Sequence, residues 1–126
     1  MAQKILIADD EAYIRILMEQ TLEELEDEGV EFFFAENGRQ ALELAIQEQP
    51  QLIFLDVMMP YVDGLEVCRQ IKIGLKLEKS TVVLLTAKGQ ESDKIKAREV
   101  GADAYITKPF DPDLLLKMAK EILFSH

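Results

Sequence analysis

The sequence predicts an α/β fold in which a doubly wound, five-stranded parallel sheet lies between two layers of helices. Five short apolar runs are spread along the 126 residues, and most of them lack the polar alternation of a strand with one wet face. The segments between the runs change to the three-and-four spacing of amphipathic helices. Strands that alternate with helices favour right-handed crossovers and a parallel sheet. We expect one domain over residues 1–126, because this length suits a single core.

The five apolar runs are the expected strands. They cover residues 5–8, 30–35, 52–55, 81–86 and 104–107. All except the second lack strict alternation and therefore suit strands that are covered on both faces. In parallel sheets of this kind, ligands bind beyond the carboxyl ends of the strands. Polar residues that directly follow the runs are therefore the candidates for chemistry.

Three helices are expected between the first four strands. Apolar residues recur at helical spacing along residues 14–25, which predicts the first helix. Asn-Gly at residues 37–38 opens the second, whose apolar stripe covers residues 41–46. Asp-Gly at residues 63–64 opens the third, with a stripe at residues 65–75.

The last two helices differ in the strength of their pattern. Residues 90–100 offer few apolar positions, so the fourth helix should be mostly exposed and loosely held. Asp111 and Pro112 open the fifth helix, since Asp is a good cap and Pro fits the first helical position. Its apolar stripe covers residues 115–122. Five helices then accompany the five strands.

The composition limits the class of protein. Apolar residues make up 48% and charged residues 30% of the chain, as in compact globular proteins. The net charge of -10 disfavours direct binding to nucleic acid or to an acidic membrane surface. The chain has a single cysteine, Cys68, and no segment that resembles a signal peptide or a membrane span. We therefore expect a cytoplasmic protein that is not attached to a membrane.

Acidic residues follow the first and third runs. Asp9 and Asp10 come directly after the first run, and Asp56 comes directly after the third. Three carboxylates at one edge of a sheet are costly unless a cation or protons offset their charge. Oxygen ligands without a nearby His or clustered Cys favour a hard ion. The sequence therefore predicts a Mg²⁺ site in which Mn²⁺ can substitute.

Asp56 is the candidate acceptor of a phosphoryl group. Residues 8–12 carry carboxylates in place of the glycines or hydroxyls with which nucleotide and flavin folds receive phosphate. A carboxylate can attack a phosphoryl group, and Mg²⁺ with the ammonium of Lys108 would neutralise the transition state. Thr86, in the fourth run, could then donate its hydroxyl to a phosphoryl oxygen. Such an aspartyl phosphate would act as a switch.

The chain resembles the response-regulator receiver domains of two-component signalling, in particular the chemotaxis regulators, over essentially its whole length. The family pattern is an acidic pair, a phosphoacceptor Asp, a Thr or Ser and a Lys-Pro after strands one, three, four and five. The matching residues are Asp9-Asp10, Asp56, Thr86 and Lys108-Pro109, with Met59-Pro60 and Asp63-Gly64 beside them. The resemblance implies a flavodoxin-like α/β/α fold with strand order 2-1-3-4-5.

The resemblance also implies the metal ligands and the partners. Asp10 and Asp56 would bind the metal directly, together with the backbone carbonyl of Met58, and Asp9 would bind it through water. A histidine kinase or a phosphotransfer protein would donate the phosphoryl group. The domain would catalyse only its own phosphorylation and dephosphorylation. It would then regulate an output protein or domain, with phosphorylation-dependent homodimerisation as a further possibility.

The resemblance implies a switch built from Thr86 and Tyr105. Tyr105 would turn inward when the Thr86 hydroxyl moves toward the phosphoryl group. That movement would remodel the surface formed by the fourth helix, the fifth strand and the fifth helix. The peptide bond between Lys108 and Pro109 would be cis.

Several alternatives remain open at the level of sequence. Asp9 and Asp10 could cap the first helix, Thr86 could be an ordinary strand residue, and Tyr105 could be a fixed aromatic. A metal-dependent phosphatase or phosphotransferase with an Asp nucleophile is a rival, although such enzymes place a second acid where this chain has Met58. A second rival is an interaction domain that works without phosphorylation.

Overall fold

Five parallel strands form the central sheet of the computed structural model, which describes residues 3–87 and 91–124. The strands are β1 (Lys4–Ala8), β2 (Glu31–Ala35), β3 (Leu52–Asp56), β4 (Thr81–Ala87) and β5 (Ala104–Lys108). The α-helices are α1 (Ala12–Thr21), α2 (Gly38–Glu48), α3 (Gly64–Arg69), α4 (Glu91–Glu99) and α5 (Pro112–Phe124). A 3₁₀ segment, η1 (Glu23–Glu28), follows α1, and a π-helical segment, η2 (Gln70–Gly74), follows α3.

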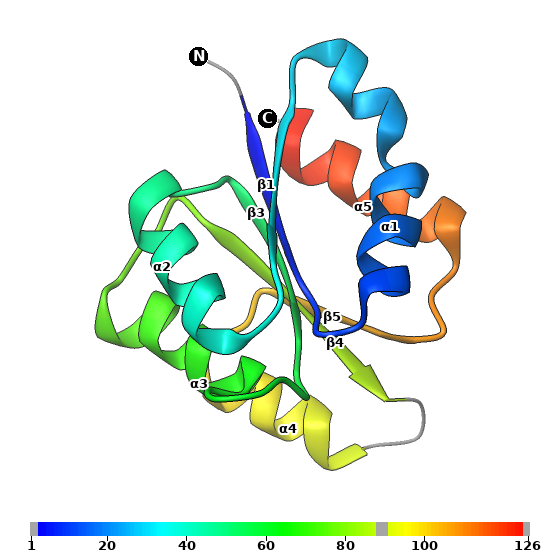
Figure 1. Ribbon diagram of the computed structural model, residues 1–126. Coiled ribbons are helices and arrows are strands. Elements are labelled where there is room, and N and C mark those ends of the chain that lie inside the picture. The colour runs from blue at the N-terminus through cyan, green and yellow to red at the C-terminus, as the bar shows by residue number, and fades with distance from the viewer. Residues whose placement is uncertain (1–2, 88–90, 125–126) are drawn as a thin grey trace.

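The sheet has the order β2-β1-β3-β4-β5, and all its neighbouring strands are parallel. Helices α1 and α5 cover one face, while α2, α3 and α4 cover the other (Figure 1). The predicted doubly wound α/β fold and its strand order are confirmed. The strand order reverses between β1 and β3, and ligands in such folds bind at this reversal.

Each face of the sheet has its own apolar core. Ile5 and Ile7 of β1 pack in the core beneath α1 and α5, whereas Leu6 and Ala8 pack in the core beneath α2 and α3. All four side chains are fully buried, because successive residues of a strand point to opposite faces. A slip of one residue would move each of these side chains into the opposite core, where its neighbours differ. The carboxyl end of β1 is therefore held in a fixed place.

The helix starts follow the predicted capping residues. The side chain of Asn37 accepts a hydrogen bond from the backbone N–H of Gln40, at 2.9 Å, at the start of α2. The side chain of Asp63 accepts one from Glu66 at the start of α3, also at 2.9 Å. Asp111 precedes α5, and its carboxylate accepts from the N–H of residue 113. These bonds satisfy N–H groups that have no partner within their helix.

The first and third helices are shorter than predicted. Helix α1 ends at Thr21, and the 3₁₀ segment η1 carries the chain onward while still burying Leu25. After α3, the N–H of Leu75 bonds to the carbonyl of Gln70, five residues earlier, at 2.7 Å. The prediction that Leu75 continues the buried stripe is wrong, since its side chain is 49% exposed. A π turn holds more residues than an α turn and so carries Leu75 off the buried face.

The fourth helix is as exposed as its sequence predicts. Ala97 is its buried residue within the described side chains, whereas Ile95 faces solvent. Residue 90 of the predicted range lies outside the described residues. Among residues 3–87 and 91–124, no helix combines the length and the apolar character that crossing a membrane requires.

Candidate functional site

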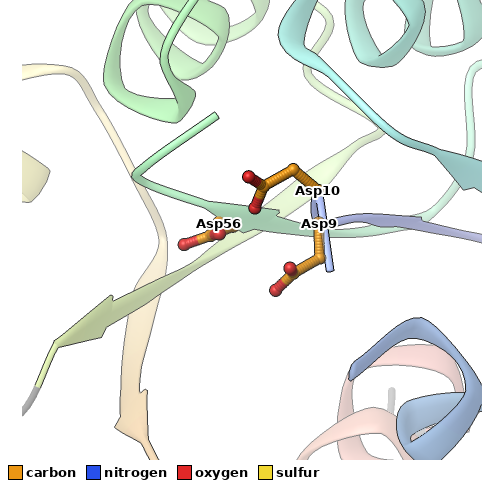
Figure 2. A group of neighbouring side chains, drawn as sticks. All are labelled: Asp9, Asp10 and Asp56. Atoms are coloured by element: carbon orange, nitrogen blue, oxygen red, sulfur yellow. The ribbon is translucent and has the colours of Figure 1, made fainter. Parts of the chain in front are cut away.

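Three carboxylates meet at the carboxyl edge of the sheet. Asp9 and Asp10 follow β1, and Asp56 is the last residue of β3, so both sides of the strand-order reversal contribute (Figure 2). One oxygen from each carboxylate lies within 4.8 Å of the others. Asp9 and Asp56 are buried, whereas Asp10 is exposed. The cluster is therefore open to solvent on the side of Asp10.

Asp9 is fixed through its backbone and both carboxylate oxygens. Its N–H donates to the carbonyl of Ala35 at 3.1 Å, which ties it to the end of β2. Its Oδ1 accepts from the N–H of Glu11 at 2.9 Å. The residue that caps α1 is Glu11, which makes no side-chain cap bond. The capping alternative for Asp9 and Asp10 thus does not describe this turn.

Lys108 joins the two buried carboxylates from the end of β5. Its Nζ lies 2.7 Å from Oδ2 of Asp9 and 3.2 Å from Oδ2 of Asp56. A third carboxylate oxygen, from Glu11, lies 3.8 Å away. Burial opposes the charged form of Lys108, but its hydrogen bond to Asp9 and the nearby negative charges outweigh burial and raise its pKa. The peptide bond from Lys108 to Pro109 is cis, the isomer that the family resemblance implies.

Asp56 is held against a tight loop. Its Oδ1 accepts from the N–H of Met58 at 3.3 Å. Gly64 packs so closely behind it that a Cβ there would lie 2.1 Å from the backbone oxygen of Asp56. The N–H of Gly64 donates to the carbonyl of Val57 at 2.9 Å. The start of α3 therefore sets the backbone from which the Asp56 side chain projects.

The electrostatics favour a cation at this cluster. Burial, followed by the negative charge of Asp9, raises the pKa of Asp56 to about 6, against the opposing effect of Lys108. Burial and a neighbouring like charge both disfavour the ionised form of Asp56, and a bound cation would favour it. Three oxygen donors with solvent access suit a hard divalent ion, which retains several of its waters. Asp9, Asp10 and Asp56 thus fit the metal predicted from the sequence.

Thr86 lies on the same edge of the sheet, and Tyr105 lies apart from the carboxylates. The residue opposite Asp56 on β4 is Leu85, so Thr86 stands one position nearer the carboxyl edge. Its side chain is buried. Tyr105, on β5, is 39% exposed, and the ammonium of Lys94 on α4 lies 5.7 Å from the centre of its ring. The side chain of Met58 faces solvent.

Arg15 also contacts the site, although nothing in the sequence points to it. Its Nη1 donates to the backbone carbonyl of Asp9 at 2.6 Å. An arginine near the start of an amphipathic helix looks like part of a solvated face, so no sequence pattern distinguishes it. The contact between Arg15 and Asp9 becomes evident only in the fold, where α1 packs next to the loop after β1.

Comparisons with known proteins agree with this geometry. A family model described as the response regulator receiver domain matches residues 5–120. The chemotaxis protein CheY4 of Vibrio cholerae is 31% identical, with a TM-score of 0.83, and the match covers 98% of this chain and 100% of that chain. A signal receiver domain of a histidine kinase from Syntrophus aciditrophicus is 34% identical, with a TM-score of 0.83 and coverage of 97% and 90%. DrrB of Thermotoga maritima, an OmpR/PhoB homologue, is 32% identical, with a TM-score of 0.82 and coverage of 98% and 53%.

Proposed function

The chain belongs to the response regulator receiver domain family, and from this we propose that Asp56 accepts a phosphoryl group in a Mg²⁺-dependent reaction. Receiver domains are phosphoacceptors that work with kinases and output domains in two-component signalling. The observation that carries the proposal is the pairing of two buried carboxylates with Lys108 beside the open carboxylate of Asp10. This is the charge arrangement that phosphoryl transfer to a carboxylate requires.

Each residue of the cluster has a distinct proposed role. Asp10, Asp56 and the backbone carbonyl of Met58 would hold Mg²⁺ directly, Asp9 would hold it through water, and Mn²⁺ could take its place. The ion would supply positive charge to the transferred group. Lys108 supplies a second positive charge and offsets the repulsion between the carboxylates of Asp9 and Asp56. The domain promotes only its own phosphorylation and dephosphorylation.

We propose a histidine kinase or a phosphotransfer protein as the donor. A hollow of about 320 Å³ adjoins Lys108 and is lined by apolar residues that include Tyr13, Leu17 and Phe110. Tyr13 is 64% exposed although it is large and aromatic. An apolar surface next to the acceptor suits a protein that must bring its phosphohistidine to Asp56.

We propose that the signal leaves through the surface formed by α4, β5 and α5. Thr86 would bond to the phosphoryl group and draw the end of β4 toward it, and Tyr105 would turn inward in response. A hollow of about 420 Å³ borders Tyr105 and is lined in part by Lys94 and Leu114. A change in the position of Tyr105 would therefore alter a surface that an output protein, an attached domain or a second copy could contact.

The location in the cytoplasm, expected from the sequence, remains part of this proposal. Cys68 is a buried free thiol, which suits a reducing compartment.

Incubation with Mg²⁺ and a small acyl-phosphate donor tests the proposal. The wild type should gain the mass of one phosphoryl group, and Asp56→Asn should gain none. Thr86→Ala should still accept the group but should respond less in partner binding. A wild type that stays unmodified contradicts the proposal. Sustained release of phosphate from a phosphomonoester would instead support the phosphatase rival.

A further inference from the structure

We infer that Arg15 is a positioning residue for the metal site, which it serves by fixing the peptide that links Asp9 to Asp10. The inference rests on the proposed function only in taking a divalent cation as the ligand of the cluster. Arg15 touches none of the carboxylates in this role. It acts through the main chain that carries them.

The contact is short and largely shielded from water. Nη1 of Arg15 donates to the carbonyl of Asp9 at 2.6 Å, and the arginine side chain is 16% exposed. Nη2 lies 3.7 Å from a carboxylate oxygen of Glu36, in the loop after β2. The planar guanidinium can therefore contact the Asp9 carbonyl and the Glu36 carboxylate at the same time. It links α1 to the loops that follow β1 and β2.

The peptide after Asp9 matters because it orients Asp10. The other polar atoms of Asp9 are already bonded, to Ala35, Glu11 and Lys108. Within the described residues, no hydrogen bond reaches the carboxylate of Asp10, which is exposed. The backbone alone therefore sets where the Asp10 side chain leaves the main chain, and the bond from Arg15 holds the carbonyl of the peptide that precedes it.

The charge of Arg15 and its positioning role predict opposite effects on cation binding when the arginine is removed. The guanidinium is a positive charge close to the cluster, so its removal alone would strengthen the binding of a cation. Its removal as a positioning group would weaken binding, because the backbone that carries Asp10 would no longer be held in place. The sign of the change therefore separates the two roles.

Calorimetric titration of the metal-free protein with Mg²⁺ provides the test, and Mn²⁺ binding followed by electron paramagnetic resonance provides a second readout. Arg15→Met should bind Mg²⁺ about tenfold more weakly, at the lower end of the effect usual for groups that orient metal ligands. Arg15→Lys retains the charge and one donor, and it should recover part of the affinity.

Arg39→Met is the matched control, since it removes the same charge from the start of helix α2. Arg39 lies over the ring of Tyr61, 5.0 Å from its centre, and makes no contact with Asp9 among the described residues. This variant should bind Mg²⁺ as tightly as the wild type, or more tightly.

The rate of phosphorylation by an acyl phosphate separates positioning from general damage. In Arg15→Met, the Mg²⁺ concentration for half-maximal rate should rise about tenfold, while the rate at saturating Mg²⁺ stays near that of the wild type. Unchanged or tighter Mg²⁺ binding in Arg15→Met would overturn the inference, as would a fall in the saturated rate alone. If the wild type binds Mg²⁺ but accepts no phosphoryl group, the proposed function fails and the titrations still decide the role of Arg15.

Discussion

Asp56 lies where burial and neighbouring charge both disfavour its ionised form. Its pKa is raised from an ordinary 3.8 to about 6. A carboxyl whose pKa is raised in the folded state stabilises that state while it is protonated. The stabilisation is fully present below about pH 4 and is lost as the pH rises through about 6. At neutral pH, ionised Asp56 should therefore destabilise the folded state of the metal-free wild type.

Asp56→Asn should remove this electrostatic destabilisation. We expect the free energy of unfolding without metal to exceed that of the wild type by roughly 2 kcal/mol at about pH 7.5. The gain should shrink between about pH 6 and 4, since the wild-type carboxyl becomes protonated there. Urea unfolding at several pH values in the presence of a chelator measures the difference.

Excess Mg²⁺ is the control for this prediction. The cation should offset the negative charge of the carboxylates and raise the free energy of unfolding of the wild type close to that of the Asn variant. It should have little effect on the Asn variant itself. A stability difference that is the same at about pH 4 and pH 7.5 would show that the charge of Asp56 is not its cause.

Cys68 should be chemically inert in the folded protein. Its side chain is fully buried, its thiol donates to the carbonyl of Val100 at 3.6 Å, and burial raises its pKa to about 12. The reactive thiolate is therefore scarce at about pH 8. Mass spectrometry after treatment with iodoacetamide should show alkylation in denaturant and almost none in native buffer. Equal rates in the two conditions would contradict the burial of this thiol.

At the scale of residues, the sequence predicted the acidic cluster but not what holds it. Asp9, Asp10 and Asp56 follow strands whose apolar character is unmistakable, so their meeting at one edge follows from parallel topology. The bond from Arg15 to the carbonyl of Asp9 depends instead on how α1 crosses the loop before it. No residue type or spacing encodes that crossing.

At the scale of elements, the junction between β3 and α3 has no room for a side chain. A Cβ at position 64 would lie 2.1 Å from the backbone oxygen of Asp56. Gly64→Ala should therefore lower the free energy of unfolding by about 1–3 kcal/mol, the usual cost of overpacking. Because the clash falls on Asp56 itself, the variant should also accept a phosphoryl group more slowly. Urea unfolding and the acyl-phosphate assay measure the two effects.

Gly74→Ala is the matched control at the other end of the same helical segment. A Cβ there would meet only the carbonyl oxygen of Arg69, at 4.0 Å. This variant should be as stable as the wild type or gain up to about 1 kcal/mol, because alanine loses less backbone entropy in a helix. Equal destabilisation by both substitutions would rule out the close approach at Gly64 as the cause.

Elements that depart from regular helix were the ones that the sequence could not predict. The apolar spacing through Leu25 and Leu75 is compatible with continuous α-helices. The chain instead enters a 3₁₀ segment before Gly29, which has a left-handed φ of 87°, and a π turn before Leu75. The spacing of apolar residues does not distinguish such turns from a continued α-helix.

At the scale of the whole molecule, the fold was readily predictable. Apolar runs without alternation can be buried only between two layers, so helices must cover both faces of the sheet. The β1 and β3 strands then stand side by side in the middle, with Leu6 next to Ile53. Asp9 and Asp56 at their ends must meet. The acidic cluster is thus a consequence of topology, and Lys108 comes to it from β5 across the end of β4.

The central claim is that this edge of the sheet makes Asp56 the acceptor of a phosphoryl group. Reaction with an acyl phosphate and Mg²⁺, followed by borohydride reduction and peptide sequencing by mass spectrometry, identifies the modified residue directly, because the reduction converts an aspartyl phosphate to homoserine. The account predicts homoserine at position 56, dependent on Mg²⁺ and absent without the donor. Homoserine at position 9 or 10 instead, or at none of the three aspartates, would contradict it.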